Sequence, residues 1–373
     1  MKKIIKVAAL VLVATLLVGC FAACGSNENS SGEIFIGATG PLTGDASAYG
    51  ISVKNGAELA VAEINAAGGV NGITFKFEMK DDKATAADAA TAYDTLMDAG
   101  MKVSLGSVTS GSCEAFAGAA EEDNLFFITP SASAANVITY GSNSFRVCFG
   151  DPDQGILAAK ELVKNYKNIG CIYDTSDTYS TGVYKAFEGE MKNLGKTYEV
   201  RTFDADNKKD FSSQVDALKN CDVIFLPIYY TEAGLIANAC ASKGVNAALF
   251  GCDGLDGVVE QIDKSVVSNK VSYITPFDVN STEDKVSNFV TAYEEKYGEK
   301  PDQFAADGYD AVYAIFEAMK AANIDDASIS ASDLSDALQA AITAKDFVLK
   351  GLTGEMTWDA SGACTKVPVI VEL

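Results

Sequence analysis

The sequence predicts an α/β protein built from two doubly wound parallel-sheet lobes. Segments with strand-like and helix-like apolar spacing alternate along most of the chain. The length of 373 residues suits two domains of about 100–200 residues each. The chain also holds more predicted strands than one sheet of about 4–6 strands would contain, so two sheets fit better.

The first predicted elements show the alternation clearly. A short apolar strand at 34–38 ends in a Gly/Pro turn, and a helix follows at 50–67, where Val53, Ala57 and Ile64 recur at helical spacing. Gly68 and the next glycine end this helix. Further strands are predicted at 73–80, 103–106, 126–128, 169–173, 198–202, 223–227 and 248–251, and further helices at 85–99, 112–122, 154–165, 182–194, 211–219 and 232–242. Repeated β-α-β units imply parallel strands joined by right-handed crossovers.

The C-terminal part departs from this alternation. Helices are predicted at 285–297, 306–321 and 334–343, followed by a hairpin-like segment at 354–359 and a last strand at 367–371.

Composition excludes several classes of function. The net charge of −22 argues against nucleic acid as a partner, because phosphates require clustered Lys and Arg. The chain has no histidine, which excludes Ser-His-Asp and Cys-His catalysis and every His-ligated zinc site. No two cysteines form a CxxC pair, so we expect no metal site and no cofactor. Cys171 and Cys221 begin apolar runs and are predicted to be buried small side chains. The sequence leaves undecided whether one pair of the cysteines forms a disulfide.

The N-terminus is predicted to be an export signal. Three lysines in residues 1–6 precede the apolar segment 7–18, which is too short to span about 30 Å of hydrocarbon as a helix. The sequence 17–20 then resembles a lipobox, which implies a signal peptide at 1–19 and lipidation of Cys20, with Cys24 as the alternative acceptor. An ordinary cleaved signal with incidental cysteines is the other interpretation. Residues 20–32 would form the lipidated N-terminus and a flexible polar tether.

Several motifs, in their order along the chain, resemble the leucine/isoleucine/valine-binding protein family, the type I "Venus flytrap" solute receptors of ABC importers. The resemblance spans roughly residues 33–373. The most specific stretch is Gly56-Ala57-Glu58-Leu59-Ala60 followed by Ile64-Asn65-Ala66-Ala67-Gly68-Gly69-Val70-Asn71-Gly72. The others are residues 36–44, Tyr49-Gly50, Asp81-Asp82, Thr129-Pro130-Ser131-Ala132-Ser133, Asp153-Gln154-Gly155, Gly308-Tyr309-Asp310-Ala311 and Thr357-Trp358-Asp359.

This resemblance implies two lobes joined by a three-segment hinge. We expect the first lobe at 33–147 plus 277–352 and the second at 148–276 plus 353–373. It also implies a monomeric, lipid-anchored receptor on the outer face of the cell membrane. Such a receptor captures an amino acid, branched-chain or similar, and delivers it to the permease and ATPase subunits of an ABC importer.

One wall of the implied site consists of hydroxyl-bearing loops. Residues 107–112 lie between a strand and a helix, where backbone N–H groups and hydroxyls can bind a carboxylate. By resemblance, Ser110 and Ser133 bind the carboxylate of the ligand, and the carbonyl of Ser131 faces its ammonium group. Ala132 lies between these two serines, and Val108 and Thr109 flank the ligand's side chain. The alternatives are that these residues only cap a helix or form a Ser-rich turn.

An acid and aromatic rings complete the implied site, and Tyr179 and Tyr229 among them would come from the second lobe and close over the ligand. Asp253 matches the position of the family's acidic ammonium partner, usually Glu, although it equally suits a turn before glycine. Tyr49, Tyr179 and Tyr229 match aromatic residues that line the cleft, and Phe304 matches less securely; each could serve packing alone. Ser131 stands where the namesake proteins have a small Ala, so the pocket is expected to be more polar or differently shaped.

Two rival functions remain open on the sequence. An enzyme of the same architecture lacks support, because the chain has no histidine, no GxSxG and no metal-ligand spacing. A sensory receptor that binds an amide or another small metabolite would share every feature above. The sequence shows no appended signalling domain, which favours transport.

Overall fold

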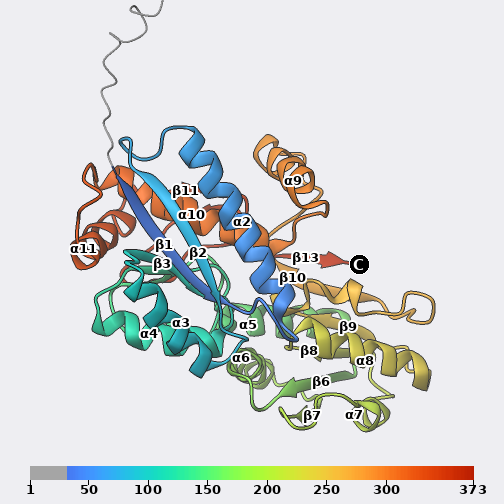
Figure 1. Ribbon diagram of the computed structural model, residues 1–373. Coiled ribbons are helices and arrows are strands. Elements are labelled where there is room, and N and C mark those ends of the chain that lie inside the picture. The colour runs from blue at the N-terminus through green and yellow to red at the C-terminus, as the bar shows by residue number, and fades with distance from the viewer. Residues whose placement is uncertain (1–31) are drawn as a thin grey trace, which may run out of the picture.

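The computed structural model describes residues 32–373, which form two parallel sheets with helices on both faces (Figure 1). The predicted fold class is therefore confirmed. Cys20, Cys24 and the signal segment lie outside the described residues. No helix within 32–373 is long and apolar enough to cross a membrane.

The first sheet has the strand order β2-β1-β3-β4-β5, and all its neighbouring strands are parallel. Its strands are β1 (Glu33–Gly40), β2 (Thr74–Asp81), β3 (Val103–Ser107), β4 (Phe127–Thr129) and β5 (Ser144–Arg146). Successive side chains of β1 point to opposite faces, as the pleat requires. Ile34 and Ile36 pack in the core under α2 (Ser47–Ala66) and α10 (Gln303–Ala321). Phe35 packs on the other face, with α3 (Ala86–Asp98) and α4 (Ser110–Glu122).

Helices α2 and α10 pack backbone against backbone because glycines stand at their contact. A Cβ atom on Gly56 would lie 1.9 Å from the carbonyl oxygen of Ala305, and one on Gly308 would lie 2.5 Å from that of Val53. Two of the sequence motifs therefore serve this helix contact, which holds the start of α10 beside the start of α2.

The second sheet has the order β13-β10-β9-β8-β6-β7, in which only β13 is antiparallel to its neighbour. Its strands are β6 (Ile169–Asp174), β7 (Glu199–Phe203), β8 (Val223–Leu226), β9 (Ala248–Gly251), β10 (Val271–Thr275) and β13 (Val369–Glu372). Phe225 of β8 packs in a core with α5 (Asp151–Asn165) and α6 (Thr178–Asn193). Ile224 packs on the opposite face, towards α7 (Ser212–Ala217) and α8 (Tyr230–Lys243).

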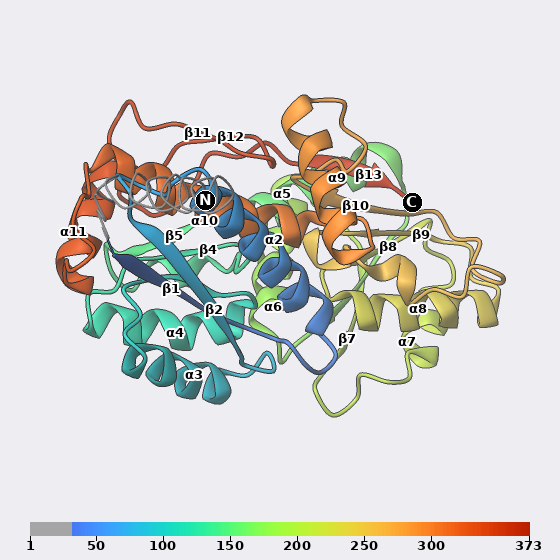
Figure 2. The ribbon, with the colours of Figure 1, turned by 45° about the horizontal axis from the view of Figure 1, so that its top comes forward.

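The chain passes between the two sheets three times, at 147–150, 276–283 and 357–368. In both sheets the strand order reverses beside the first strand, between β1 and β3 and between β6 and β8. Loops at such switch points lie at the carboxyl ends of the strands, where open α/β sheets bind ligands. The second view shows the two sheets end to end, with α2 and α6 near their junction (Figure 2). The exact lobe boundaries near 148, 276 and 353 stay predictions.

Most predicted elements are present, with shifted ends. Helix α6 begins four residues before the predicted start at Gly182, because Asp177 caps it by accepting a hydrogen bond from the backbone N–H of Ser180 at 2.7 Å. Strands β5 and β10 were not predicted. The C-terminal region contains the predicted helices as α9 (Asp284–Tyr297), α10 and α11 (Ala331–Ile342). The predicted hairpin is smaller, with β12 (Glu355–Met356) pairing β11 (Leu349–Lys350).

Candidate functional site

A small cavity of about 20 Å³, called here the inner cavity, lies between the two lobes. It is lined by Tyr49, Val108, Thr109, Ser110, Ser131, Tyr179, Tyr229, Asp253, Gly254 and Phe304. Every residue predicted for the site is in this set except Ala132 and Ser133, and Gly254 is an addition. The lining residues come from loops after β3, β4, β8 and β9 and from the starts of α2, α6 and α10.

The start of α4 forms the hydroxyl-bearing wall. Thr109 is its N-cap residue, but its hydroxyl donates to Ser112 Oγ at 3.2 Å and does not cap the helix. Ser110 Oγ accepts a hydrogen bond from the backbone N–H of Ala134 at 3.2 Å, so its own proton can point into the cavity. A hydroxyl at the amino end of a 13-residue helix is well suited to bind an anionic group.

Of the segment Ser131–Ser133, only Ser131 lines the inner cavity. Ser131 Oγ donates to the carbonyl of Val108 at 2.8 Å, which fixes this side chain at the cavity wall. The backbone N–H of Ala132 donates to Thr129 Oγ1, and Ala132 is fully buried behind the wall. The carbonyl of Ser133 accepts hydrogen bonds from Arg146 and from the backbone N–H of Asp151. Ser133 therefore supports the loop from behind, and its predicted contact with the ligand stays a prediction.

Asp253 is the buried acid of the site. Its Oδ2 accepts a hydrogen bond from Gln154 Nε2 at 3.0 Å, and its Oδ1 accepts one from the backbone N–H of Gly254 at 2.8 Å. Burial raises the pKa of Asp253 to about 7, and hydrogen bonds from Tyr179, Gly254 and Gln154 only partly offset this effect. A cation placed beside this buried carboxyl group would strongly stabilise its ionised form.

Two glutamines that were not predicted as site residues position Asp253. Gln154 of α5 also accepts a hydrogen bond from the backbone N–H of Asp253, at 3.1 Å, so two hydrogen bonds join these residues. Gln303, the first residue of α10, donates to the carbonyl of Asp253 at 2.9 Å. Gln154 falls within the Asp153-Gln154-Gly155 motif, and this motif is the only feature of the sequence that could have pointed to Gln154 as a site residue.

Four aromatic rings close the cavity. The rings of Tyr49 and Phe304 lie with centroids 4.2 Å apart, and Tyr179 and Tyr229 stack at 5.2 Å with an interplanar angle of 7°. Tyr49 also meets Tyr229 edge-on at 5.5 Å. Because Tyr49 and Phe304 lie on first-lobe helices and the other two on the second lobe, the rings meet across the interlobe gap.

Polar contacts across the gap show that the lobes are closed on each other. The hydroxyl of Tyr49 donates to the carbonyl of Gly254 at 2.5 Å and accepts from the backbone N–H of Tyr230 at 3.0 Å. At the rim, Lys208 Nζ lies 3.1 Å from Asp45 Oδ2. These contacts join groups of the protein itself, so they stabilise the closed arrangement of the lobes directly.

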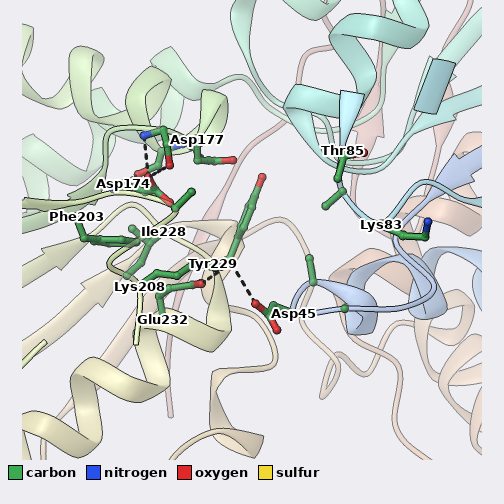
Figure 3. A pocket seen from close by; sticks show the side chains of 16 residues that line it. Asp45, Lys83, Thr85, Asp174, Asp177, Phe203, Lys208, Ile228, Tyr229 and Glu232 are labelled. Carbon is green, nitrogen blue, oxygen red and sulfur yellow. Dashed lines mark hydrogen bonds and ion pairs between the residues drawn. The ribbon is translucent and has the colours of Figure 1, made fainter. Parts of the chain in front are cut away.

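A larger cavity of about 490 Å³, called here the outer cavity, opens beyond Tyr229 (Figure 3). Its charged lining residues are Asp45, Lys83, Asp174, Asp177, Lys208 and Glu232. Lys208 also lies 3.4 Å from Glu232. Burial raises the pKa of Asp177 to about 6, and a hydrogen bond from Tyr229 acts in the opposite direction.

The inner cavity thus offers an acid, hydroxyls and a helix amino end, and no basic side chain lines it. Within residues 32–373, no group of three or more Cys, Asp or Glu residues could hold a metal ion. The seven cysteines of this part of the chain are free thiols, and Cys171 and Cys221 are buried as predicted.

Comparisons with known proteins agree with this architecture. A family model described as periplasmic binding protein matches residues 33–365. The Leu/Ile/Val-binding protein BraC3 of Rhizobium johnstonii is 34% identical over 227 residues, which cover 60% of this chain and 62% of that protein. The alignment therefore spans less than two thirds of this relative.

Two solved structures share the fold over nearly the whole chain. The branched-chain amino acid transporter substrate-binding protein LivJ of Streptococcus pneumoniae, in complex with isoleucine, superposes with a TM-score of 0.80 at 28% identity. That comparison covers 91% of this chain and all of LivJ. The leucine-binding protein LivK of Thermotoga maritima gives a TM-score of 0.80 at 26% identity, covering 90% of this chain and 94% of that one.

Proposed function

Because the chain belongs to the periplasmic binding protein family, we propose that it captures an amino acid in the inner cavity and delivers it to the permease of an ABC importer. The observation that carries this proposal is that an acid and an anion-binding helix start line the same small cavity. Asp253 faces the cavity from the second lobe, and Ser110 at the start of α4 faces it from the first.

A zwitterion matches both walls of the cavity. Its ammonium group would pair with Asp253, whose burial makes an unpaired negative charge costly. Its carboxylate would accept a hydrogen bond from the Ser110 hydroxyl and face the amino end of α4. The absence of a basic lining residue disfavours a ligand with a second carboxylate or a phosphate.

The names of similar proteins support an amino acid as the ligand. BraC3 is named for Leu, Ile and Val, and the LivJ structure contains isoleucine. These are properties of those proteins, and they make branched-chain or similar amino acids the first class to test here.

The interlobe contacts suggest how capture works. Opening the cleft would break the hydrogen bonds of Tyr49 to Gly254 and Tyr230 and expose Asp253 to water. A ligand that contacts both lobes binds the closed form better and shifts the equilibrium towards it. The permease would then recognise the closed form.

We further propose that the protein is exported, is held on the outer face of the cell membrane by a lipid on Cys20, or on Cys24, and acts as a monomer. The apolar segment 7–18 supports export, and the lipobox-like sequence 17–20 supports the lipid anchor. The polar tether up to residue 32 would leave both lobes free to move.

Titration calorimetry with the twenty amino acids tests the function directly. We expect at least one to bind with saturable one-to-one stoichiometry, and Asp253→Asn to weaken its binding by about 2 kcal/mol or more. Asp94→Asn, which removes an exposed acid from α3, is the matched control and should leave binding unchanged. Equal affinity of the wild type and Asp253→Asn would refute the site.

A further inference from the structure

Two hydroxyl groups that line the inner cavity are oriented by hydrogen bonds within the first lobe. Ser131 Oγ donates to the carbonyl of Val108 at 2.8 Å, and Thr109 Oγ1 donates to Ser112 Oγ at 3.2 Å. All four residues follow strand β3 or β4 of the first sheet. Opening or closing the interlobe gap changes the volume of the cavity but does not touch these bonds. The orientation of both hydroxyls is therefore the same for every ligand that enters.

Ser131 is held as a hydrogen-bond acceptor towards the cavity. A serine hydroxyl carries one proton and two lone pairs, and the proton of Ser131 is used on the Val108 carbonyl. This bond is buried, so turning the proton towards a ligand would take the donor away from a buried carbonyl oxygen. Ser131 Oγ therefore offers its lone pairs to a ligand in the cavity that this residue lines.

Thr109 and Ser110 have opposite roles at the same wall. The Thr109 hydroxyl gives its proton to Ser112, so it too can only accept from a ligand. Ser110 Oγ accepts from the backbone N–H of Ala134, which leaves its proton for the ligand's carboxylate. The first lobe thus lines the cavity with one hydroxyl that donates and two that accept.

A zwitterion with an apolar side chain would leave the two accepting hydroxyls without a partner. Its ammonium group is proposed to pair with Asp253, which belongs to the second lobe. Its carboxylate has no proton to donate, and it would repel the lone pairs of Ser131 and Thr109. A donor for these two oxygens must therefore come from the side chain of the ligand. A buried acceptor that is left without a donor strongly disfavours a ligand that lacks one.

We propose that the ligand is an amino acid whose side chain carries a hydroxyl or amide donor, and that Ser131, together with Thr109, selects it by accepting a hydrogen bond from that donor. This inference rests on the proposed function and narrows its substrate class. Valine and leucine would make the same contacts through their ammonium and carboxylate groups, so the discrimination lies in the side chain alone.

Pairs of amino acids with the same shape isolate this hydrogen bond. L-threonine has a hydroxyl where L-valine has a methyl group, and L-asparagine has an amide where L-leucine has an isopropyl group. The preference ratio of a pair is the association constant of its polar member divided by that of its apolar member, both measured by titration calorimetry. The wild type should have a ratio above about ten in at least one pair. Ser131→Ala should lower that ratio at least about fivefold.

Ser104→Ala is the matched control. Ser104 Oγ also donates to a buried carbonyl, that of Gly37 at 2.8 Å, but Ser104 does not line the inner cavity. Its loss should therefore lower stability and leave the preference ratio unchanged. If Ser131→Ala does not fold, as judged by circular dichroism, Ser131→Cys keeps the size of the side chain. It replaces the oxygen with a weak sulfur acceptor and should also lower the ratio.

The outcomes separate the two proposals. A preference ratio of about ten or less in both pairs, or an unchanged ratio in a folded Ser131 variant, would overturn the selection of a side-chain donor. Equal weakening of both members of a pair is one such result, and it would place Ser131 Oγ at the ligand's ammonium group instead. In each of these cases the proposed function stands, because an amino acid still binds. Binding of none of the twenty amino acids would overturn the proposed function itself.

Discussion

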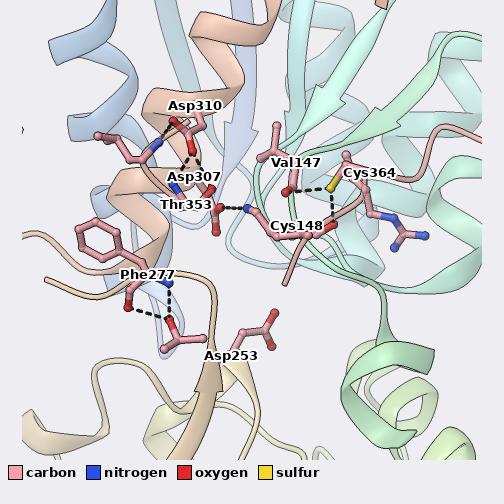
Figure 4. Close-up of polar contacts among 12 residues, drawn as sticks. Val147, Cys148, Asp253, Phe277, Asp307, Asp310, Thr353 and Cys364 are labelled. Atoms are coloured by element: carbon pink, nitrogen blue, oxygen red, sulfur yellow. Dashed lines mark hydrogen bonds and ion pairs between the residues drawn. The ribbon is translucent and has the colours of Figure 1, made fainter. Parts of the chain in front are cut away.

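Lys366 Nζ lies 2.8 Å from Asp307 Oδ1, and both side chains are buried. Figure 4 shows this ion pair as a dashed line at Asp307, close to the segments that connect the lobes. Lys366 belongs to the third connection between the sheets, and Asp307 to α10 of the first lobe. Burial raises the pKa of Asp307 to about 6, and Lys366 partly offsets that rise, so the pair is charged at neutral pH. The next turn of α10 carries Asp310, which accepts from the backbone N–H groups of Leu352 and Thr353 at 2.7 and 2.9 Å.

Lys366→Met should therefore destabilise the protein by about 3–5 kcal/mol, because it leaves a buried carboxylate without its partner. Urea denaturation followed by circular dichroism measures the effect. Adding Asp307→Asn in the same chain should recover a large part of the loss. Lys320→Met, which breaks an exposed pair with Glu317 on the same helix, should cost less than about 1 kcal/mol. Similar losses for the two lysine variants would contradict a special role of the buried pair.

Ser110→Ala should weaken amino acid binding by about 2 kcal/mol or more, because it removes the hydroxyl proposed to bind the ligand's carboxylate. It also leaves the buried N–H of Ala134 without its acceptor, which should lower the free energy of unfolding by about 1–3 kcal/mol. Calorimetry and urea denaturation separate the two effects. Ser110→Thr keeps the hydroxyl and should retain most of the binding, whereas binding unchanged in Ser110→Ala would remove this residue from the site.

Ligand affinity should fall as the pH drops below 7. The raised pKa of Asp253, about 7, means that at lower pH the ligand's ammonium must displace a proton from this carboxyl group. The association constant should decrease up to about tenfold per pH unit between pH 7 and 5. Calorimetry in buffers from pH 5 to 8 measures this slope. Asp253→Asn should flatten it, and a flat profile in the wild type would show that Asp253 does not pair with the ligand.

The folding stability of the ligand-free protein should rise as the pH drops, in contrast to the ligand affinity. The folded-state pKa values of Asp253 and Asp302 are raised to about 7, well above the unfolded value near 3.8. Between these pH values the folded state binds more protons than the unfolded state, so stability falls as the pH rises through 7. The melting temperature without ligand should be higher at pH 5 than at pH 8. Asp253→Asn should reduce this difference.

The lipid anchor is tested by partitioning. The full-length protein expressed in its host should enter the detergent phase of a Triton X-114 extraction, because one acylated cysteine carries long apolar chains. Cys20→Ser should move it to the aqueous phase, whereas Cys24→Ser should not. The reverse pattern would identify Cys24 as the acceptor, and aqueous partitioning of the wild type would contradict the anchor.

The order of strands and helices could be predicted because it depends on local spacing. Apolar residues at period 3.6 marked α2 and α3, and short apolar runs marked β6 and β8. The start of α6 was placed four residues too late, because the hydrogen bond by which Asp177 caps this helix leaves no apolar period in the sequence. Strand β5, three residues long, was missed because its pairing with β4 defines it more than its own sequence does.

For this protein, the sequence alone determined the α/β class, the two-lobed arrangement by resemblance, the burial of Cys171 and Cys221, and a set of site candidates of which most line one cavity. Only the tertiary structure showed that Gln154 holds Asp253 from 99 residues away, that Lys366 pairs with Asp307, and that Tyr229 separates a small cavity from a large one. The reason is physical: secondary structure follows from neighbours along the chain, whereas the volume of a cavity and the partner of a buried charge depend on how distant segments pack together.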